Sequence, residues 1–152
     1  MQGKIAVEEH FRIAETTGSE GRYPGPYWAG LSAKLLDIHD ARLAEMDKTG
    51  IEIEVISLNS NAVQGIPDLA KAAEVARKAN DALAEAVAKR PDRFAALGAL
   101  PMQDPQAAAD ELHRCVRESA RRLAILLAEA VEETIYQERN VLFAVSQRRQ
   151  VQ

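Results

Sequence analysis

The sequence has only one cysteine, no long apolar run and no excess of basic residues. A single cysteine, Cys115, cannot form an internal disulfide, which is typical of proteins from the reducing cytoplasm. No run of 18 or more apolar residues occurs, so we expect no membrane-spanning helix. The net charge of −4 leaves no basic face for nucleic-acid phosphates. We therefore expect a cytoplasmic globular protein that binds neither nucleic acid nor membranes.

Glycine and proline are missing from residues 106–152, because the last glycine is Gly98 and the last proline is Pro105. These are the two chief turn-forming residues. The C-terminal third is therefore predicted to be mostly continuous helix, or to have a different origin from the rest. Apolar residues at helical spacing predict one helix from about Pro105 to Tyr136, and NVLFAVS, residues 140–146, fits a short strand.

The remainder of the chain alternates between apolar runs and amphipathic segments. Three runs rich in apolar and β-branched residues predict strands: Ile5–Val7, Ile51–Leu58 and Phe94–Leu100. Three segments have the period of a helix: Asp37–Thr49, Leu69–Val87 and a segment that starts at Asp104–Pro105. Gly50 fits a helix C-cap, and Asp68 and Asp104 precede predicted helix starts. The Gly- and Pro-rich residues 18–28 predict a long loop.

This strand–helix alternation predicts parallel strands with crossover helices, which is an α/β architecture. A (β/α)₈ barrel takes about 250 residues. If these are barrel units, the chain holds the first three of them, followed by a mainly helical tail.

Glu8 and His10 lie at the end of the first predicted strand, in KIAVEEHF. In a regular strand, residues two apart share a face, so Glu8 and His10 point to one side and Glu9 to the other. A carboxylate and an imidazole are two ligands of a mixed divalent-metal site, and in a barrel this end of the strand carries the active site. The alternative is a strand that runs out into solvent. In either case, two ligands do not complete a catalytic site.

Other candidate residues have equally simple structural interpretations. Tyr23, Tyr27 and Trp28 form either an aromatic lid over a ring-shaped substrate or an anchor for the long loop. Asn59, after the second strand, either faces the same pocket or has a structural role. Cys115 is most simply a small core residue.

Four blocks then carry a resemblance to a known family: MQGKIAVEEHF, RLAEMDKTGIEIEVISLN, RKANDALAEAVAKRPDRFAALGALPMQDP and AADELHRCV. In this order, from Met1 to about Val116, they resemble the N-terminal part of the γ-resorcylate (2,6-dihydroxybenzoate) decarboxylases. These enzymes belong to the amidohydrolase-related group that also holds aminocarboxymuconate-semialdehyde decarboxylase. The resemblance stops after Val116.

The resemblance implies a truncated amidohydrolase-type (β/α)₈ barrel over residues 1–116 and a divergent, mostly helical tail over residues 117–152. It implies one divalent metal ion, zinc or manganese, with Glu8 and His10 as ligands. The implied reaction removes CO₂ from hydroxybenzoates such as 2,6-dihydroxybenzoate, so the partner is a small aromatic carboxylic acid. No catalytic residue is identifiable, because the family's other ligands and its proton-transfer histidine come from later strands. We assign substrate binding to Tyr23 and Asn59, and we expect a homo-oligomer.

Three hypotheses follow for the function. In the first, the chain is a decarboxylase by descent that is active only if another chain supplies the missing barrel. In the second, it is a non-catalytic remnant that self-associates through open strand edges. In the third, it is a hydrolase of the same superfamily, since loops set the chemistry of a barrel.

Overall fold

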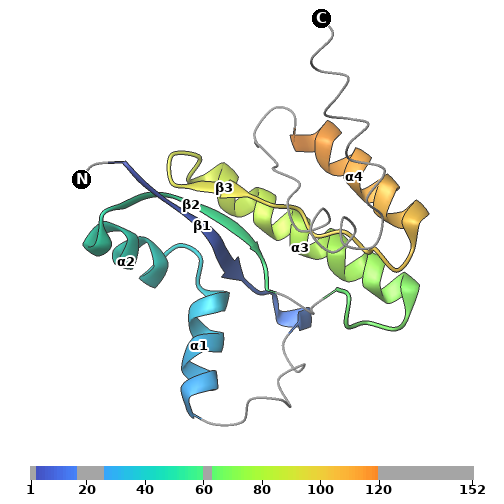
Figure 1. Cartoon of the computed structure of the whole chain (residues 1–152), viewed down its shortest axis with the longest axis horizontal. Coiled ribbons are helices and arrows are strands. Elements are labelled where there is room, and N and C mark those ends of the chain that lie inside the picture. The colour runs from blue at the N-terminus through green and yellow to red at the C-terminus, as the bar shows by residue number, and fades with distance from the viewer. Residues whose placement is uncertain (1–2, 17–25, 60–62, 120–152) are drawn as a thin grey trace, which may run out of the picture.

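The computed structural model describes residues 3–16, 26–59 and 63–119. Three strands form one sheet in the order β1-β2-β3: β1 (Lys4–Phe11), β2 (Ile51–Leu58) and β3 (Phe94–Ala96). Both strand pairs are parallel. The α-helices are α1 (Pro26–Leu36), α2 (Ala41–Thr49), α3 (Leu69–Lys89) and α4 (Pro105–Ser119) (Figure 1). The predicted α/β architecture with parallel strands is therefore confirmed.

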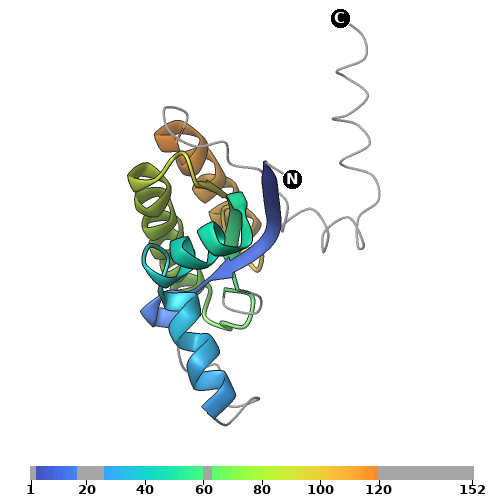
Figure 2. The same ribbon diagram turned by 90° about the vertical axis from the view of Figure 1, so that its left-hand side faces the viewer.

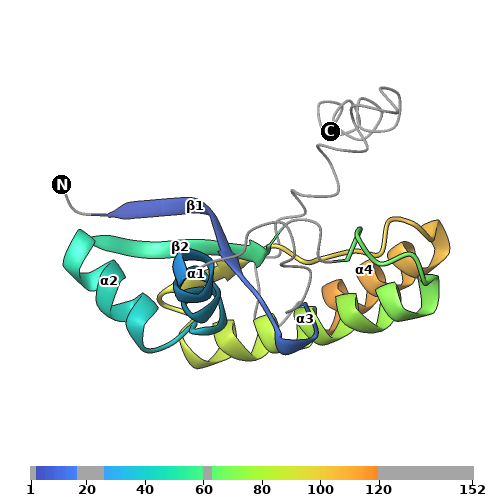
Figure 3. The same cartoon turned by 90° about the horizontal axis from the view of Figure 1, so that it is seen from below.

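The helices of the described ranges all lie on one side of the sheet (Figures 2 and 3). Between the two layers is the core, to which the sheet contributes Phe11, Ile56 and Leu58. The facing helix α3 contributes an apolar stripe of residues: Ala72, Val75, Ala76, Ala79, Leu83 and Val87. The predicted three- and four-residue spacing gave most of this stripe, but it began at Leu69, which is 48% exposed, and it missed the buried Val75. None of the helices in these ranges is long and apolar enough to cross a bilayer.

Local sequence signals set most of the helix ends. The Asp68 carboxylate accepts a hydrogen bond from the backbone N–H of Lys71 at 2.9 Å, which caps α3. The Asp104 carboxylate accepts from the backbone N–H of Ala107 at 3.1 Å at the start of α4. Gly50 ends α2 in the left-handed conformation, with φ of 72°. These three predicted caps are confirmed.

The prediction differs from the structure at several boundaries. Part of the predicted loop, from Pro26 onward, is the first turn of α1, because proline at the first helical position favours a helix start. Helix α2 begins at Ala41 rather than Asp37, because the Asp37 carboxylate accepts the backbone N–H groups of Asp40 and Ala41 and forms a turn. Strand β1 runs on to Phe11, beyond the predicted Val7.

Strand β3 ends at Ala96, although an apolar run to Leu100 was predicted as strand. The Leu97 N–H still donates to the Ile56 carbonyl at 2.9 Å. After Gly98, however, the backbone of Ala99 bonds to the side chain of Asn80 instead of to a strand. A long-range side-chain contact thus ends the strand, and no local pattern announces it. Most of the predicted tail, residues 120–152, lies outside the described residues.

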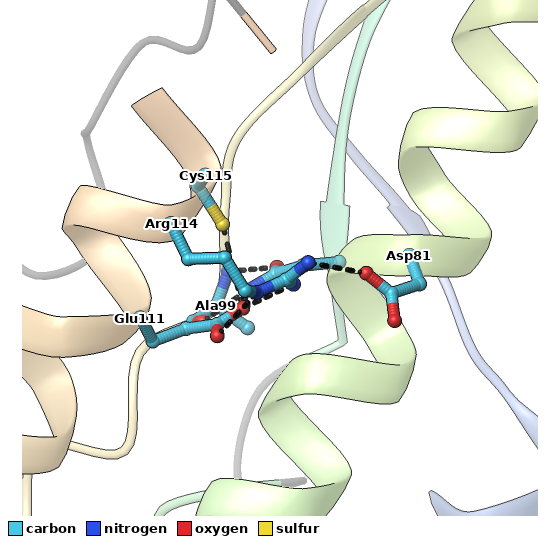
Figure 4. A network of polar contacts seen from close by, with 6 residues as sticks. Asp81, Ala99, Glu111, Arg114 and Cys115 are labelled. Atoms are coloured by element: carbon cyan, nitrogen blue, oxygen red, sulfur yellow. Dashed lines mark hydrogen bonds and ion pairs between the residues drawn. The ribbon is translucent and has the colours of Figure 1, made fainter. Parts of the chain in front are cut away.

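A buried polar network fixes α3 against α4 (Figure 4). The Asn80 amide donates to the Ala99 carbonyl at 2.9 Å and to the Glu111 carboxylate at 2.8 Å, and accepts from the Ala99 N–H at 2.8 Å. Arg114 bridges the helices, because it donates to Glu111 and to Asp81, each at 2.7 Å. Cys115 is buried in this cluster, with its Sγ 3.4 Å from Glu111 Oε1, so its prediction as a core residue is confirmed.

The ionisation of the network follows from its contacts. Burial opposes the charge on Glu111, but hydrogen bonds from Arg114 and Asn80 outweigh it and bring the pKa of this carboxyl below its ordinary value. Burial, together with the neighbouring Glu111 charge, raises the pKa of the Cys115 thiol to about 12. The thiol is therefore protonated and poorly nucleophilic at neutral pH.

Candidate metal site at the end of the first strand

Strand β1 contains a β-bulge just before the predicted ligands. Ala6 pairs with Glu54 and Glu9 pairs with Ile56, so Val7 and Glu8 together lie opposite the single residue Val55. Glu8 has φ of 65°, the left-handed conformation that costs a residue with a Cβ about 1–2 kcal/mol. Bulges of this kind are frequent next to active sites, where they redirect a side chain.

The bulge changes the argument that placed Glu8 beside His10. Regular alternation is interrupted at Glu8, so the sequence spacing alone does not determine the direction of its side chain. Glu8 is exposed and His10 is half-buried at the next-but-one position. Their joint role as metal ligands stays a prediction. The regular strand geometry on which that prediction was based is wrong at Glu8.

The position of His10 is well defined. Beyond the bulge, His10 pairs with Ser57 and Phe11 pairs with Leu58. Phe11 lies in the core under the helices, so His10 lies on the opposite face of the sheet. Its Nδ1 is 3.1 Å from the Oγ of Ser57, which is only 1% exposed. One ring nitrogen of His10 is therefore hydrogen-bonded within the sheet.

Arg42, on α2, supports the same residue through its backbone. One guanidinium nitrogen, Nη2, donates to the carbonyl of His10, and the other, Nη1, pairs with Glu54 at 2.9 Å. The side chains of Arg42 and Glu54 are only 11% and 8% exposed. A buried ion pair on the helical side thus holds the strand at the point where His10 projects from it.

The donor set at this end of β1 fits part of a divalent-metal site. A carboxylate oxygen and an imidazole nitrogen are ligands that zinc and manganese accept. Within residues 3–16, 26–59 and 63–119, no three His, Cys, Asp or Glu side chains come together in a way that could hold a metal ion. Glu8 and His10 therefore supply at most two of the ligands that a catalytic site needs.

Asn59 follows the last residue of β2, at the same carboxyl end of the strands as His10. Its backbone N–H donates to the Phe11 carbonyl at 2.9 Å, which extends the pairing of β1 and β2 by one residue. Its side-chain Oδ1 is buried without a hydrogen-bond partner. Asn59 thus has a structural role through its backbone and an unused acceptor on its side chain. Of the loop aromatics, Tyr27 is 84% exposed on α1, and Tyr23 lies outside the described residues.

Sequence reasoning missed Ser57 and Arg42. Ser57 is the only polar residue in the apolar second half of IEIEVISL, and that isolation was the available signal. Arg42 had no comparable signal, because its partners Glu54 and the His10 carbonyl are distant in sequence.

Comparison with known proteins identifies the family of the chain. The family profile described as Amidohydrolase matches residues 27–131. The γ-resorcylate decarboxylase of Rhizobium sp. (strain MTP-10005) is 60% identical over 119 residues, which cover 78% of this chain and 36% of that protein. The enzyme of the same name from Polaromonas sp. (strain JS666) is 56% identical over the same shares of the two chains. The chain thus spans about a third of the length of these relatives.

Solved structures show the same similarity. A 2,6-dihydroxybenzoate decarboxylase in complex with 2,6-dihydroxybenzoate superposes with a TM-score of 0.74 and 59% identity, over 79% of this chain and 37% of that chain. A dihydroxybenzoic acid decarboxylase from Polaromonas sp. JS666, with bound manganese and the inhibitor 2-nitroresorcinol, gives a TM-score of 0.73 and 52% identity, over 79% and 36%. These neighbours are barrel decarboxylases, so the described parallel sheet corresponds to part of such a barrel.

Proposed function

The chain belongs to the amidohydrolase family, and on this premise we propose that it provides the first-strand metal ligands of a non-oxidative decarboxylase of hydroxybenzoates such as 2,6-dihydroxybenzoate. The observation that carries the proposal is the placement of Glu8 and His10 at the carboxyl end of β1, in a chain 60% identical to γ-resorcylate decarboxylases. The metal is zinc or manganese. We also propose a cytoplasmic location, because Cys115 is a free thiol.

The residues of this chain would act by binding and orienting. The Glu8 carboxylate and the His10 imidazole would hold the metal, and the unpartnered Oδ1 of Asn59 would accept a hydrogen bond from a phenolic hydroxyl of the substrate. We also propose Tyr23, which lies outside the described residues, as a substrate-binding residue. When bound, a divalent ion supplies Lewis-acid polarisation of the carboxylate and phenolate oxygens.

Loss of CO₂ also requires a proton at the ring carbon, and therefore a positioned acid. We assign this role to none of the described residues. We therefore expect the chain by itself to show no appreciable decarboxylase turnover, and we expect activity only where further protein supplies the remaining ligands and the acid.

Metal binding is tested by isothermal titration of the chain with Mn²⁺ and with Zn²⁺. We expect micromolar binding that disappears in Glu8→Ala and in His10→Ala. Glu45→Ala and His113→Ala are the matched controls, because they remove an exposed carboxylate and an exposed imidazole from α2 and α4. An absence of binding by the parent chain, or an equal loss in the controls, would contradict the proposed site.

The reaction is tested with 2,6-dihydroxybenzoate labelled with ¹³C at the carboxyl group, by measuring labelled CO₂ in the presence of each metal. Turnover at the rate of a full-length relative would show that the chain needs no further ligand or acid. Hydrolysis of an ester or amide, with no CO₂ release, would favour the hydrolase alternative.

A second candidate function is self-association. In the described sheet, β1 is an edge strand, and it exposes two apolar side chains, Ile5 at 61% and Val7 at 65%. Unpaired strand edges with exposed apolar residues favour pairing with another chain. We propose a homo-oligomer formed through this edge. Sedimentation velocity should show association that Ile5→Lys weakens and that Leu36→Lys, on exposed α1, leaves unchanged.

A further inference from the structure

We propose that Ser57 is a positioning residue for His10: its hydroxyl oxygen accepts a hydrogen bond from Nδ1–H and leaves Nε2 unprotonated and directed away from the sheet as a metal ligand. This inference rests on the proposed function only where it takes the ion bound by Nε2 to be the divalent metal of that site. The ring tautomer that it requires is a property of the chain without metal.

The sheet itself brings the two side chains together. His10 and Ser57 are direct partners across the parallel pair β1 and β2, so their side chains project from the same face. The distance from Nδ1 to Oγ is 3.1 Å, and Ser57 is almost completely buried. The strand pairing fixes the backbone of Ser57 opposite His10, and burial keeps its hydroxyl away from solvent.

The chemistry of a neutral imidazole then links the two ring nitrogens. One carries a proton and donates, and the other has a lone pair and accepts. A histidine that binds a metal through one nitrogen almost always donates a hydrogen bond from the other. If Ser57 accepts from Nδ1, the metal-binding lone pair is on Nε2. If Ser57 donated to Nδ1 instead, Nε2 would carry the proton and could not bind a metal.

The backbone of His10 is fixed independently. Arg42 donates to the His10 carbonyl from the helical side of the sheet, and Glu54 holds the guanidinium. Ser57 contacts the ring from the neighbouring strand. Together these contacts set both the position of the Cα atom and the rotation of the ring, which is the support that a metal ligand needs.

The tautomer is tested by ¹⁵N NMR of the metal-free chain in alkaline solution, with the ring signals of His10 identified by their loss in His10→Ala. We expect Nδ1 to be the protonated nitrogen in the parent and in Ser57→Thr, which keeps the hydroxyl. In Ser57→Ala we expect a mixture of the two tautomers. A parent ring protonated at Nε2, or a Ser57→Ala ring identical to that of the parent, would overturn the proposal.

Metal affinity provides the second measurement. We expect Ser57→Ala to weaken Mn²⁺ or Zn²⁺ binding about 10–100-fold, as loss of a supporting partner of a ligand does. Ser57→Thr should keep the parent affinity. Thr16→Val, which also removes a buried hydroxyl, one that donates to the Ile13 carbonyl, should keep it too.

The outcomes separate the two proposals. If the parent binds no metal, the proposed function fails, and the NMR tautomer alone decides the role of Ser57. If the parent binds metal and Ser57→Ala binds it equally tightly, the role of Ser57 fails while the metal site stands.

Discussion

Asn80 joins the segment after β3 to helices α3 and α4, and its removal should have a large effect on stability. In Asn80→Ala, three hydrogen bonds disappear: two with the backbone of Ala99 and one with Glu111. A neutral hydrogen bond contributes about 1 kcal/mol and one to a charged group about 1.5–3 kcal/mol. We therefore expect the free energy of unfolding to fall by about 3–5 kcal/mol.

The loss is not recovered by solvent, because Ala99 is only 6% exposed and its N–H and carbonyl groups would be left without partners. The assay is urea unfolding followed by circular dichroism, with the midpoint and the slope fitted separately. Gln64→Ala, which removes an exposed side-chain amide, is the control. A loss below about 1 kcal/mol for Asn80→Ala, within the range of a single neutral hydrogen bond, would refute the reasoning.

The effect of Asn80→Ala should also depend on pH. The folded-state pKa of Glu111 is lowered, so the stability that its charge contributes is present above its ordinary pKa of 4.5 and is lost as the pH falls through the folded-state value. Asn80 is one of the donors that stabilise this charge. The difference in stability between Asn80→Ala and the parent should therefore narrow in acid. A difference that grows as the pH falls would contradict this account.

Three further predictions concern other contacts. Arg42→Met leaves the buried Glu54 charge unpaired and should lower the free energy of unfolding by about 3–5 kcal/mol. The double variant Arg42→Met with Glu54→Leu should recover much of this stability in urea unfolding. A double variant as unstable as Arg42→Met would contradict the unpaired charge as the cause of the loss. Gly50→Ala should lower the free energy of unfolding by about 1–2 kcal/mol, measured by calorimetry. The cause is backbone strain at φ of 72° and not a steric clash, because an added Cβ would meet no atom closer than 3.8 Å. An unchanged Tm would contradict this prediction. Cys115, with its pKa raised to about 12, should resist iodoacetamide at pH 8 when native and react fully in urea, whereas rapid native labelling would show an accessible thiolate.

The agreement between sequence and structure is closest where the signal is local. The bounds of β2, the caps at Asp68 and Gly50, and most of the apolar stripe of α3 were predictable. Each depends on residues a few positions apart, whose spacing or backbone preference acts before any tertiary contact forms.

The details of the candidate site depend instead on contacts between residues distant in sequence. The sequence by itself determined that a carboxylate and an imidazole end the first strand and that the strands are parallel. Only the tertiary structure decided that a bulge puts Glu8 in the left-handed conformation, that Ser57 meets the ring of His10, and that Arg42 holds its carbonyl. The physical reason is that these contacts depend on the pairing register of β1 with β2 and on the packing of α2. The partners of His10 are 47 and 32 positions away in the chain, and only strand pairing and helix packing bring them within hydrogen-bonding distance.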